Sequence, residues 1–551
     1  MFSMRLKKTI QMKRTFSIIS RLVLITVIMV GCTSDFESIN TDPTKATPNN
    51  FDANFFLSSA QWNYADGITG YSGPVLFQSG WVQLLASTTS GGANYYTNMD
   101  KYVPSSNTNS YQATSWERCY RSGALASEAI KNTDADPDKV NLNAAARIIR
   151  VLAAHYITDV YGDAPYSQAW QANENVTLPD YDTQEQLYKS MLADLDGALT
   201  SMDATKAKPS ADIFPYQGDV AKWKKFGYSL MLRIAMRLTK ADAVTAKAYA
   251  EKAAAGGTFE SAADDAYIIP DNANGYKNNY AGSLMTAADY YQVRWSKTLI
   301  DFLGSTDDPR LGVIAEVPQD GLANNQDATK AGNSDPNVQL GLPNGYDLNG
   351  GTTDVTHSPG YPGGTGTGAD ATPIGKYSRP KTVLYGNFNA PVFVVTYAQT
   401  ELLLAEAAVR GYSVGGTAAE HYSNGVEGAV LSLAPFGTAA VVDPVDAADY
   451  AAANPLNVGS TDASLKMINE QYWATSGALM NFAEAWNNWK RSGYPVLTPI
   501  VASGNFSNGV IPRRQPYPTT ESTLNPASYK AAVGRLEGGQ DTWSAKVWWD
   551  K

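Results

Sequence analysis

Apolar residues recur at the spacing of an α-helix in several long stretches of the chain, and this pattern constrains the fold most. In residues 143–161, Ile148 and Leu152 belong to a stripe at i, i+3, i+4 and i+7 spacing. Residues 219–239 carry a second stripe that includes Trp223, with Lys and Arg on the other faces. The alternation typical of strands is sparse. The sequence therefore predicts a mainly α-helical protein.

Further helices are predicted by the same pattern, and several form neighbouring pairs with short connections. These helices span residues 115–132, 184–202, 244–255, 296–303, 397–411, 418–432 and 464–491. Helix pairs of this size resemble tetratricopeptide units of about 34 residues, although the repeat consensus is absent. Between about residues 257 and 395 the chain is instead rich in Gly, Asn, Asp, Pro and Tyr. Long irregular connections of this kind usually carry function.

The N-terminus has the features of a bacterial lipoprotein signal. Residues 1–31 contain six bases and no acid, and the apolar run 22–30 is followed by a glycine and Cys32. The run is too short for a comfortable transmembrane helix. We expect cleavage before Cys32 and lipidation of this cysteine, with residues 32–50 as a polar tether; Met12 is an alternative start. An ordinary exported protein is the competing interpretation.

Composition narrows the possible functions. The chain has 43 Lys and Arg against 53 Asp and Glu, a net charge of −10, which disfavours binding to nucleic acid. Three His and two Cys argue against zinc, haem or iron–sulfur sites with several such ligands, and we predict no cofactor. The 32 Tyr are the dominant aromatic residues, and Tyr suits binding surfaces because it combines an apolar face with a polar group.

No motif predicts an enzyme. Residues 411–415 match G-x-S-x-G, but a predicted helix precedes them where a hydrolase needs a strand, so we expect a turn between helices. His155 and Asp159 lie four residues apart on a helix and are predicted to form a structural pair. The acidic pairs 264–265 and 307–308 could be cation ligands, yet no calcium-loop signature supports this. Metal binding stays open.

Aromatic residues in polar loops suggest a sugar ligand. A pyranose ring has an apolar face on which Trp or Tyr stacks, while Asn, Asp, Gln or Arg bonds its hydroxyls. The aromatic residues that lie near Gly, Asn, Ser or Gln are Trp81, Tyr95, Tyr96, Tyr290, Tyr291, Trp295 and Tyr361. Burial in the core is the alternative for each of them.

Several segments together resemble the SusD/RagB family of Bacteroidetes outer-membrane lipoproteins. They occur in the family's order over nearly the whole mature chain, at residues 145–169, 222–238, 296–311, 395–411, 483–499, 511–525 and 547–551. The resemblance implies a tetratricopeptide-like helical scaffold with an irregular, loop-rich ligand-binding subdomain. The expected division is a signal at 1–31, a tether at 32–50, a scaffold at 51–256, a ligand-binding region at 257–395, more scaffold at 396–435 and a C-terminal region at 436–551.

The resemblance also implies a function and a site. Family members are non-catalytic, lie lipid-anchored on the outer membrane, bind an oligosaccharide and cover a SusC-like TonB-dependent transporter. In starch-binding members an early Trp and later aromatics form the ligand face, and Trp81 and Trp295 are the expected counterparts here. Asp66 and Arg379 are predicted to contact sugar hydroxyls, because they lie in loops that carry Gly, Tyr or Pro.

We therefore predict a surface glycan-binding lipoprotein that delivers its ligand to such a transporter. Two alternatives stay open. One is a peptide-binding member of the same transport system, because Tyr-rich loops also suit peptides. The other is an exported glycan hydrolase.

Overall fold

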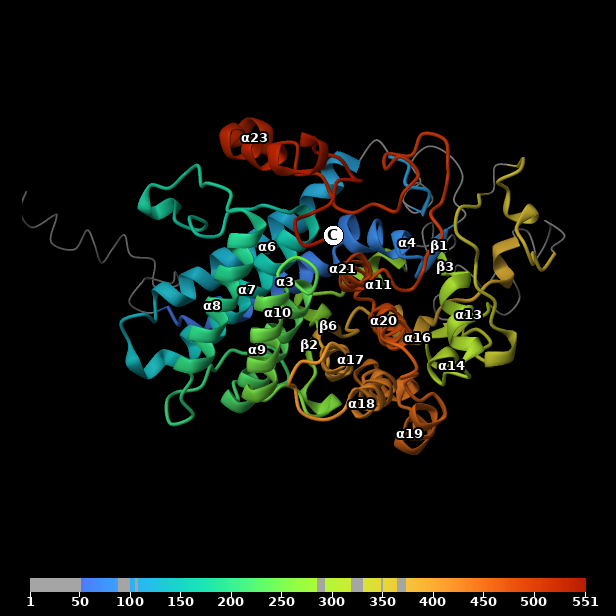
Figure 1. Cartoon of the computed structure of the whole chain (residues 1–551), viewed down its shortest axis with the longest axis horizontal. Helices are drawn as coiled ribbons and strands as arrows, with labels where there is room; N and C mark the ends of the chain where they lie inside the picture. Colours follow the sequence, from blue (N-terminus) through green and yellow to red (C-terminus); the bar gives the residue numbers. More distant parts are fainter. Residues whose placement is uncertain are drawn as a thin grey trace, which may run out of the picture. The chain divides into compact units, whose positions relative to one another are not determined.

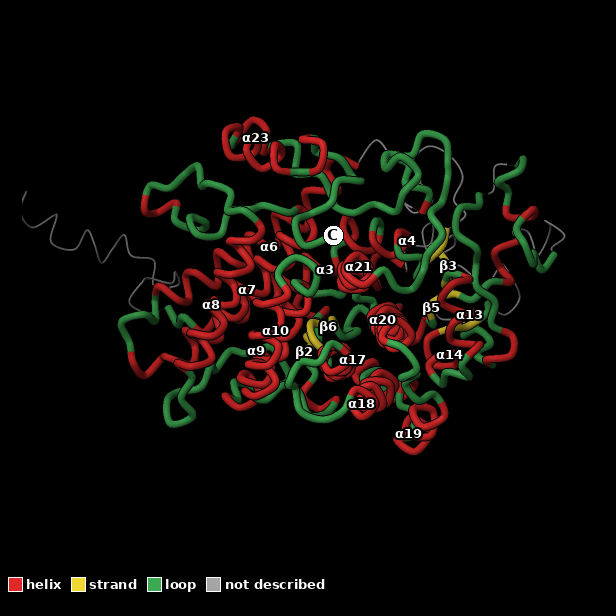
Figure 2. Tube along the Cα trace, viewed as in Figure 1, coloured by secondary structure: helices red, strands yellow, loops and turns green. Residues whose placement is uncertain are grey.

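The computed structural model describes residues 51–87, 100–104, 108–284, 293–318, 331–347, 350–363 and 373–551. Residues 53–551 form one compact unit. Helices dominate it and strands are short (Figure 2). The mainly helical fold predicted from the sequence is confirmed. Cys32 and the predicted signal and tether lie outside the described residues, so the signal, the tether and the lipidation stay predictions.

Paired helices build most of the scaffold. The pairs in contact are α3 with α6, α6 with α7, α7 with α8, α9 with α10, and α17 with α18. Their bounds are α3 (Asn54–Thr69), α6 (Thr108–Lys131), α7 (Val140–Tyr161), α8 (Gln184–Ser201), α9 (Val220–Arg237), α10 (Ala243–Gly256), α17 (Tyr397–Val409) and α18 (Ala418–Leu431). Side-chain caps define several starts: Asp219, for example, accepts from the backbone N–H of Lys222 at 3.0 Å and begins α9. Trp223, on the predicted stripe of α9, is fully buried.

A second group of helices lies later in the chain: α19 (Pro444–Ala453), α20 (Thr461–Ala478), α21 (Phe482–Ser492), α22 (Glu521–Leu524) and α23 (Pro526–Arg535). The predicted helical stretch 464–491 is divided into two helices, α20 and α21. Met480 breaks the helix with a φ of 57°, and the side chain of Asn481 begins α21 by accepting from the backbone of Glu484 at 3.4 Å.

In the described residues, three two-stranded antiparallel sheets link distant segments. β1 (Leu85–Ser87) pairs with β3 (Val293–Trp295), β2 (Ala266–Ile268) with β6 (Val392–Val395), and β4 (Ala315–Glu316) with β5 (Arg379–Pro380). Short helices accompany them: α4 (Gln78–Trp81), α11 (Asn279–Leu284), α13 (Lys297–Ser305), α14 (Arg310–Ile314) and α16 (Thr382–Tyr385). In Figure 1, α6 to α10 lie on one side of α21, and β1, β3, α13 and α14 lie on the other.

The interior joins these parts through buried charges as well as apolar contacts. Arg237 of α9 bonds Asp159 of α7 at 3.1 Å and Glu484 of α21 at 2.7 Å, and these ion-paired side chains are almost fully buried. Such pairs need hydrogen-bonded partners on each charge to persist in the core. The buried ring of His155 lies 3.3 Å from Asp159, as expected of a structural pair.

Motifs that suggested other chemistry have structural roles. Residues 411–415 lie in the turn between α17 and α18, as predicted. Asp308 pairs with Arg310 in the core. Among the described residues no three His, Cys, Asp or Glu side chains are grouped to hold a metal ion. In the same part of the chain, no helix is long and apolar enough to span a membrane.

Candidate functional site

The predicted platform Trp81 is buried, so its assignment to an exposed ligand face is wrong. Its ring centroid lies 5.1 Å from that of Trp486 in α21, 5.5 Å from that of Phe77 and 5.8 Å from that of Trp543. None of the Trp81 side chain is exposed. The polar neighbours of Trp81 on α4 suggested a surface loop, but α21 and the C-terminal segment cover it.

Trp295 and Arg379 are also buried, and their predicted exposure is wrong. The indole of Trp295 donates to the backbone oxygen of Ile314 at 3.0 Å. The guanidinium of Arg379 pairs with Glu316 at 2.8 Å across the β4–β5 sheet. Both side chains have no exposed surface. They hold together the corner made by β1, β3, β4 and β5 and offer a ligand no accessible face there.

The loops that carry the predicted tyrosines attach to this same corner. Ser87 of β1 is paired with Val293 of β3. In sequence, residues 88–99 follow Ser87 and residues 285–292 precede Val293. Tyr95, Tyr96, Tyr290 and Tyr291 lie outside the described residues, and their roles stay predictions. Tyr361 is described and half-buried against a small apolar cluster that includes Val355 and Tyr377; its role is also untested.

Asp66 lies in a surface groove, which we call the α3 groove. The groove has a volume of about 600 Å³, within the range of about 300–1,000 Å³ usual for ligand pockets. It is lined by Ser58, Ser59, Trp62, Asn63 and Asp66 of α3, by Arg118, Arg121 and Leu125 of α6, and by Ile213, Ile268, Ile269, Pro270, Asp271 and Tyr276. The α3 residues share one face of the helix, because they repeat at three- and four-residue spacing.

Two aromatic rings meet in the α3 groove. The centroids of Trp62 and Tyr276 are 5.1 Å apart, with an angle of 78° between the planes. Tyr276 is 49% exposed, and Trp62 is half-buried. The preceding turn orders Tyr276: its N–H donates to the backbone oxygen of Asp271 at 3.0 Å, and Gly275 supplies the left-handed φ of 89° that the turn requires. Trp62 and Tyr276 thus form an accessible aromatic surface of the kind that the sequence analysis predicted at Trp81.

Polar groups flank this aromatic pair. Asp66 accepts from the Nε of Arg118 at 3.0 Å and from the side-chain amide of Asn279 at 2.5 Å. The Arg118 side chain is nevertheless 46% exposed, and Arg121 lies exposed on the same helix. The groove therefore offers hydrogen-bond donors beside a stacking surface. Of these residues, only Asp66 was predicted to bind the ligand. The signal that could have identified Trp62 is its position on the same face of the helix as Ser58, Ser59 and Asp66.

Comparisons with known proteins identify the family and the fold. A sequence model of the SusD-like family, described as starch-binding and associating with the outer membrane, matches residues 44–518. The structure of a chitin-binding protein is 30% identical, with a TM-score of 0.75 over 91% of this chain and 100% of that chain.

Other solved structures share the fold at lower identity. A SusD-like protein from Bacteroides thetaiotaomicron is 22% identical with a TM-score of 0.68, covering 91% of this chain and 99% of that chain. A chitin-binding SusD homologue from Flavobacterium johnsoniae is 22% identical with a TM-score of 0.68, covering 90% and 98%. No curated protein sequence matches the chain significantly.

Proposed function

Because the chain belongs to the SusD-like family of outer-membrane-associated proteins, we propose that it is a non-catalytic glycan-binding lipoprotein of the bacterial cell surface. It is anchored through Cys32, binds an oligosaccharide and delivers it to a SusC-like TonB-dependent transporter. The observation that carries the proposal is the accessible Trp62–Tyr276 pair of the α3 groove, flanked by Arg118 and Asp66.

The α3 groove suits a sugar because it joins an apolar surface to fixed polar groups. The rings can contact the C–H face of a pyranose, and Arg118 and Arg121 can donate to hydroxyl or acetamido oxygens. The turn before Tyr276 is held by hydrogen bonds, so less ordering is required when a ligand binds. The 30%-identical protein is named for binding chitin, which makes chitin oligosaccharides the first ligand to test.

The groove carboxylates support binding rather than hydrolysis. Glycoside hydrolysis needs one carboxyl group placed to donate a proton and a second to act as base or nucleophile. Asp66 is held by Arg118 and Asn279, and Asp271 accepts from the side chain of Asn274 at 2.6 Å. Both acids thus serve the local structure.

Calorimetry with chitohexaose, maltohexaose and a wider glycan panel tests the proposal. We expect Trp62→Ala to weaken binding of the preferred glycan at least about tenfold, a loss of about 1.4 kcal/mol. Trp548→Ala is the matched control, because Trp548 is also half-buried but packs near Tyr188, far from the groove residues in sequence. Full affinity in Trp62→Ala would exclude the α3 groove as the glycan site.

Two further outcomes would replace the proposed function. Binding of peptides and of no glycan would favour the peptide-transport alternative. Release of shortened sugars by the purified protein would favour a hydrolase.

Anchoring and delivery have their own tests. Cys32→Ser should abolish fatty-acid labelling and release the protein from membranes, because stable anchoring of such a chain requires its acyl groups. Label retained in Cys32→Ser would contradict the anchor. A TonB-dependent barrel should co-purify with the native protein from gently solubilised outer membranes, and its absence would contradict delivery to such a transporter.

A further inference from the structure

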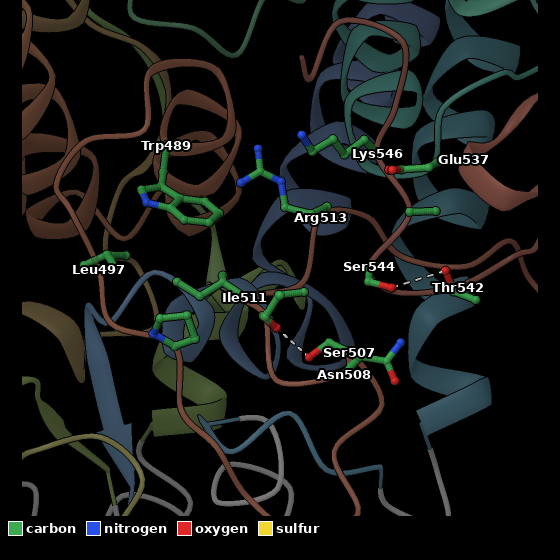
Figure 3. A pocket seen from close by; sticks show the side chains of 13 residues that line it. Trp489, Leu497, Ser507, Asn508, Ile511, Arg513, Glu537, Thr542, Ser544 and Lys546 are labelled. Atoms are coloured by element: carbon green, nitrogen blue, oxygen red, sulfur yellow. Dashed lines mark hydrogen bonds between the residues drawn. The ribbon is translucent and has the colours of Figure 1, made fainter.

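A second pocket lies near the C-terminus, on elements separate from the α3 groove. This C-terminal pocket has a volume of about 530 Å³ (Figure 3). It is lined by Trp489 of α21, by Leu497, Pro499, Ser507, Asn508, Val510, Ile511 and Arg513, and by Glu537, Thr542, Ser544, Ala545 and Lys546. No residue is shared with the α3 groove. A ligand of the C-terminal pocket would therefore contact different residues from a ligand of the groove.

Arg513 is fixed in the C-terminal pocket with one donor group left over. Its Nε donates to Asp550 at 2.7 Å, and its Nη2 donates to Asp550 and, at 3.1 Å, to the backbone oxygen of Lys490. Its Cζ lies 4.7 Å from the ring centroid of Trp489. Within the described part of the chain, Nη1 makes no hydrogen bond. A guanidinium held in this way is ordered before a ligand arrives.

A rigid turn presents the side chain of Asn508 to the same pocket. Asn508 has a φ of 55°, and Gly509 after it has a φ of 76°. The side-chain oxygen of Asn505 accepts from the N–H of Ser507 at 3.2 Å and from that of Gly509 at 2.9 Å. The hydroxyl of Ser507 donates to the backbone oxygen of Val510 at 2.6 Å. The turn is thus closed on itself, and the amide of Asn508 is available to a ligand (Figure 3).

Lys546 supplies a third donor, and part of the wall is apolar. The side chain of Lys546 is exposed and lies within ion-pair distance of no carboxylate among the residues that the structure describes. Leu497 and Ile511 lie away from Lys546 in Figure 3, and Pro499 also lines the pocket. A ligand that matches these walls has an apolar face and a group that accepts several charge-assisted hydrogen bonds.

We propose that the C-terminal pocket binds a sugar that carries a carboxylate, that is, a hexuronate. Arg513 Nη1 and Lys546 bond the carboxylate, and Asn508 bonds ring hydroxyls. Leu497 and Pro499 contact the apolar face of the ring. This site is independent of the glycan site proposed for the α3 groove.

Acidic side chains near the pocket oppose the binding of an anion. Asp550 offsets the charge of Arg513, and the exposed Glu537 adds a negative charge at the rim. Recognition then rests on directed hydrogen bonds rather than on a positive field. Glu537→Gln should strengthen binding of the anion about two- to threefold, because a repelling charge is removed.

Calorimetry with trisaccharides of galacturonate, glucuronate and mannuronate tests the site on the full folded protein. We expect at least one of them to bind, and its methyl ester, which keeps the shape but loses the charge, to bind at least about tenfold more weakly. Lys546→Gln should weaken binding of the acid about tenfold. Lys530→Gln is the matched control, an exposed lysine on α23 outside the pocket, and should have no effect.

The outcomes separate this proposal from the one for the α3 groove. Trp62→Ala should leave uronate binding unchanged, and loss of uronate binding in that variant would overturn the C-terminal site. The proposal also fails if none of the three uronates binds, if the ester binds as tightly as the acid, or if Lys546→Gln has no effect. Binding of an acidic dipeptide without any uronate would overturn it in favour of a peptide ligand.

Discussion

The interior around α21 and the α3 groove use the same residue types for opposite purposes. In the interior, Trp81 is fully covered, and Arg237 pairs with Asp159 where both side chains are 1% exposed. In the α3 groove, Trp62 is half-buried, and the Arg118–Asp66 pair has side chains that are 46% and 19% exposed. The two regions differ in exposure because segments distant in sequence cover the interior residues and leave the groove residues accessible. The local sequence does not distinguish them.

This contrast predicts that mutations in the two regions affect different properties, stability in the interior and ligand binding in the groove. Removing a large or charged side chain from the interior should cost stability, because it leaves a cavity or an unpaired buried charge. Removing its counterpart from the α3 groove should leave stability nearly intact and change ligand binding. The predictions below test that division, starting with the largest expected change.

Trp81→Ala should lower the free energy of unfolding by about 3–5 kcal/mol, the usual cost of truncating a buried aromatic residue. The ring packs against Phe77, Trp486 and Trp543, so the cavity would be shared by α4, α21 and the C-terminal segment. Urea denaturation measures the change. Glycan affinity per folded molecule should be unchanged. A loss of glycan affinity without a loss of stability would show that Trp81 belongs to the ligand site.

Arg237→Met should cost about 3–5 kcal/mol, because it removes the cation that bonds both Asp159 and Glu484 in the core and leaves Glu484 only the more distant Arg233, at 3.9 Å. The matched variant Arg118→Met breaks the exposed pair with Asp66 and should cost only about 0–1 kcal/mol. Equal losses in the two variants would remove the distinction between the interior and the α3 groove. Denaturant titration of both proteins under the same conditions makes the comparison.

The interior should also make stability depend on pH through His155. Burial, with Arg237 nearby, lowers the pKa of His155 from 6.5 to about 4, although Asp159 acts in the opposite direction. Between these values the unfolded chain binds a proton that the folded chain excludes, so the contribution of His155 to the free energy of unfolding falls as pH decreases from 6.5 towards 4. The expected loss is about 2–3 kcal/mol between pH 6.5 and 4.5.

His155→Gln is the control for this pH dependence. Burial raises the pKa of Asp100 to about 6 and that of Asp265 to about 7, so these carboxyls titrate in the same window with the opposite sign in both proteins. The variant should therefore lack only the decrease that His155 contributes between pH 6.5 and 4.5. Glu484, whose pKa the nearby Arg237 and Arg233 hold at about 2 despite burial, loses most of its contribution below pH 4.5, and its contribution is common to both proteins. Denaturation curves of both proteins at pH 6.5, 5.5 and 4.5 give the free energy of unfolding at each pH. The same change with pH in both proteins would contradict the role of His155.

Helical periodicity was sufficient to predict most of the scaffold, and the family resemblance is confirmed by the match over residues 44–518. The stripe of α9 placed Trp223 in the core correctly, because a stripe on one helix must face other helices. The break between α20 and α21 was missed. It depends on a positive φ at Met480, and methionine carries no sequence signal for that conformation.

The candidate site was harder to predict than the scaffold. Trp81 and Trp295 have polar neighbours in sequence, yet both side chains are fully buried. Segments that are distant in sequence cover Trp81, and Trp295 lies in β3, which pairs with the distant strand β1. Tyr276 lies in a loop whose composition did suggest binding. Its partner Trp62 lies more than 200 residues earlier, so that only the tertiary structure brings the two rings together.

The smaller of the two expected changes for the aromatic variants is that of Trp62→Ala, and it completes the comparison with Trp81. Trp62 packs on Tyr276 at the surface, and the aromatic contact is worth about 0.5–1.5 kcal/mol. Solvent already reaches the site, so truncation leaves no closed cavity, and we expect a loss of at most about 1.5 kcal/mol in the free energy of unfolding. Thermal and urea denaturation of Trp62→Ala beside Trp81→Ala measure the difference. A loss of 3 kcal/mol or more in Trp62→Ala, on the scale of a buried aromatic truncation, would mean that α3 depends on this ring for its packing. The groove would then be an extension of the core rather than a surface shaped for a ligand.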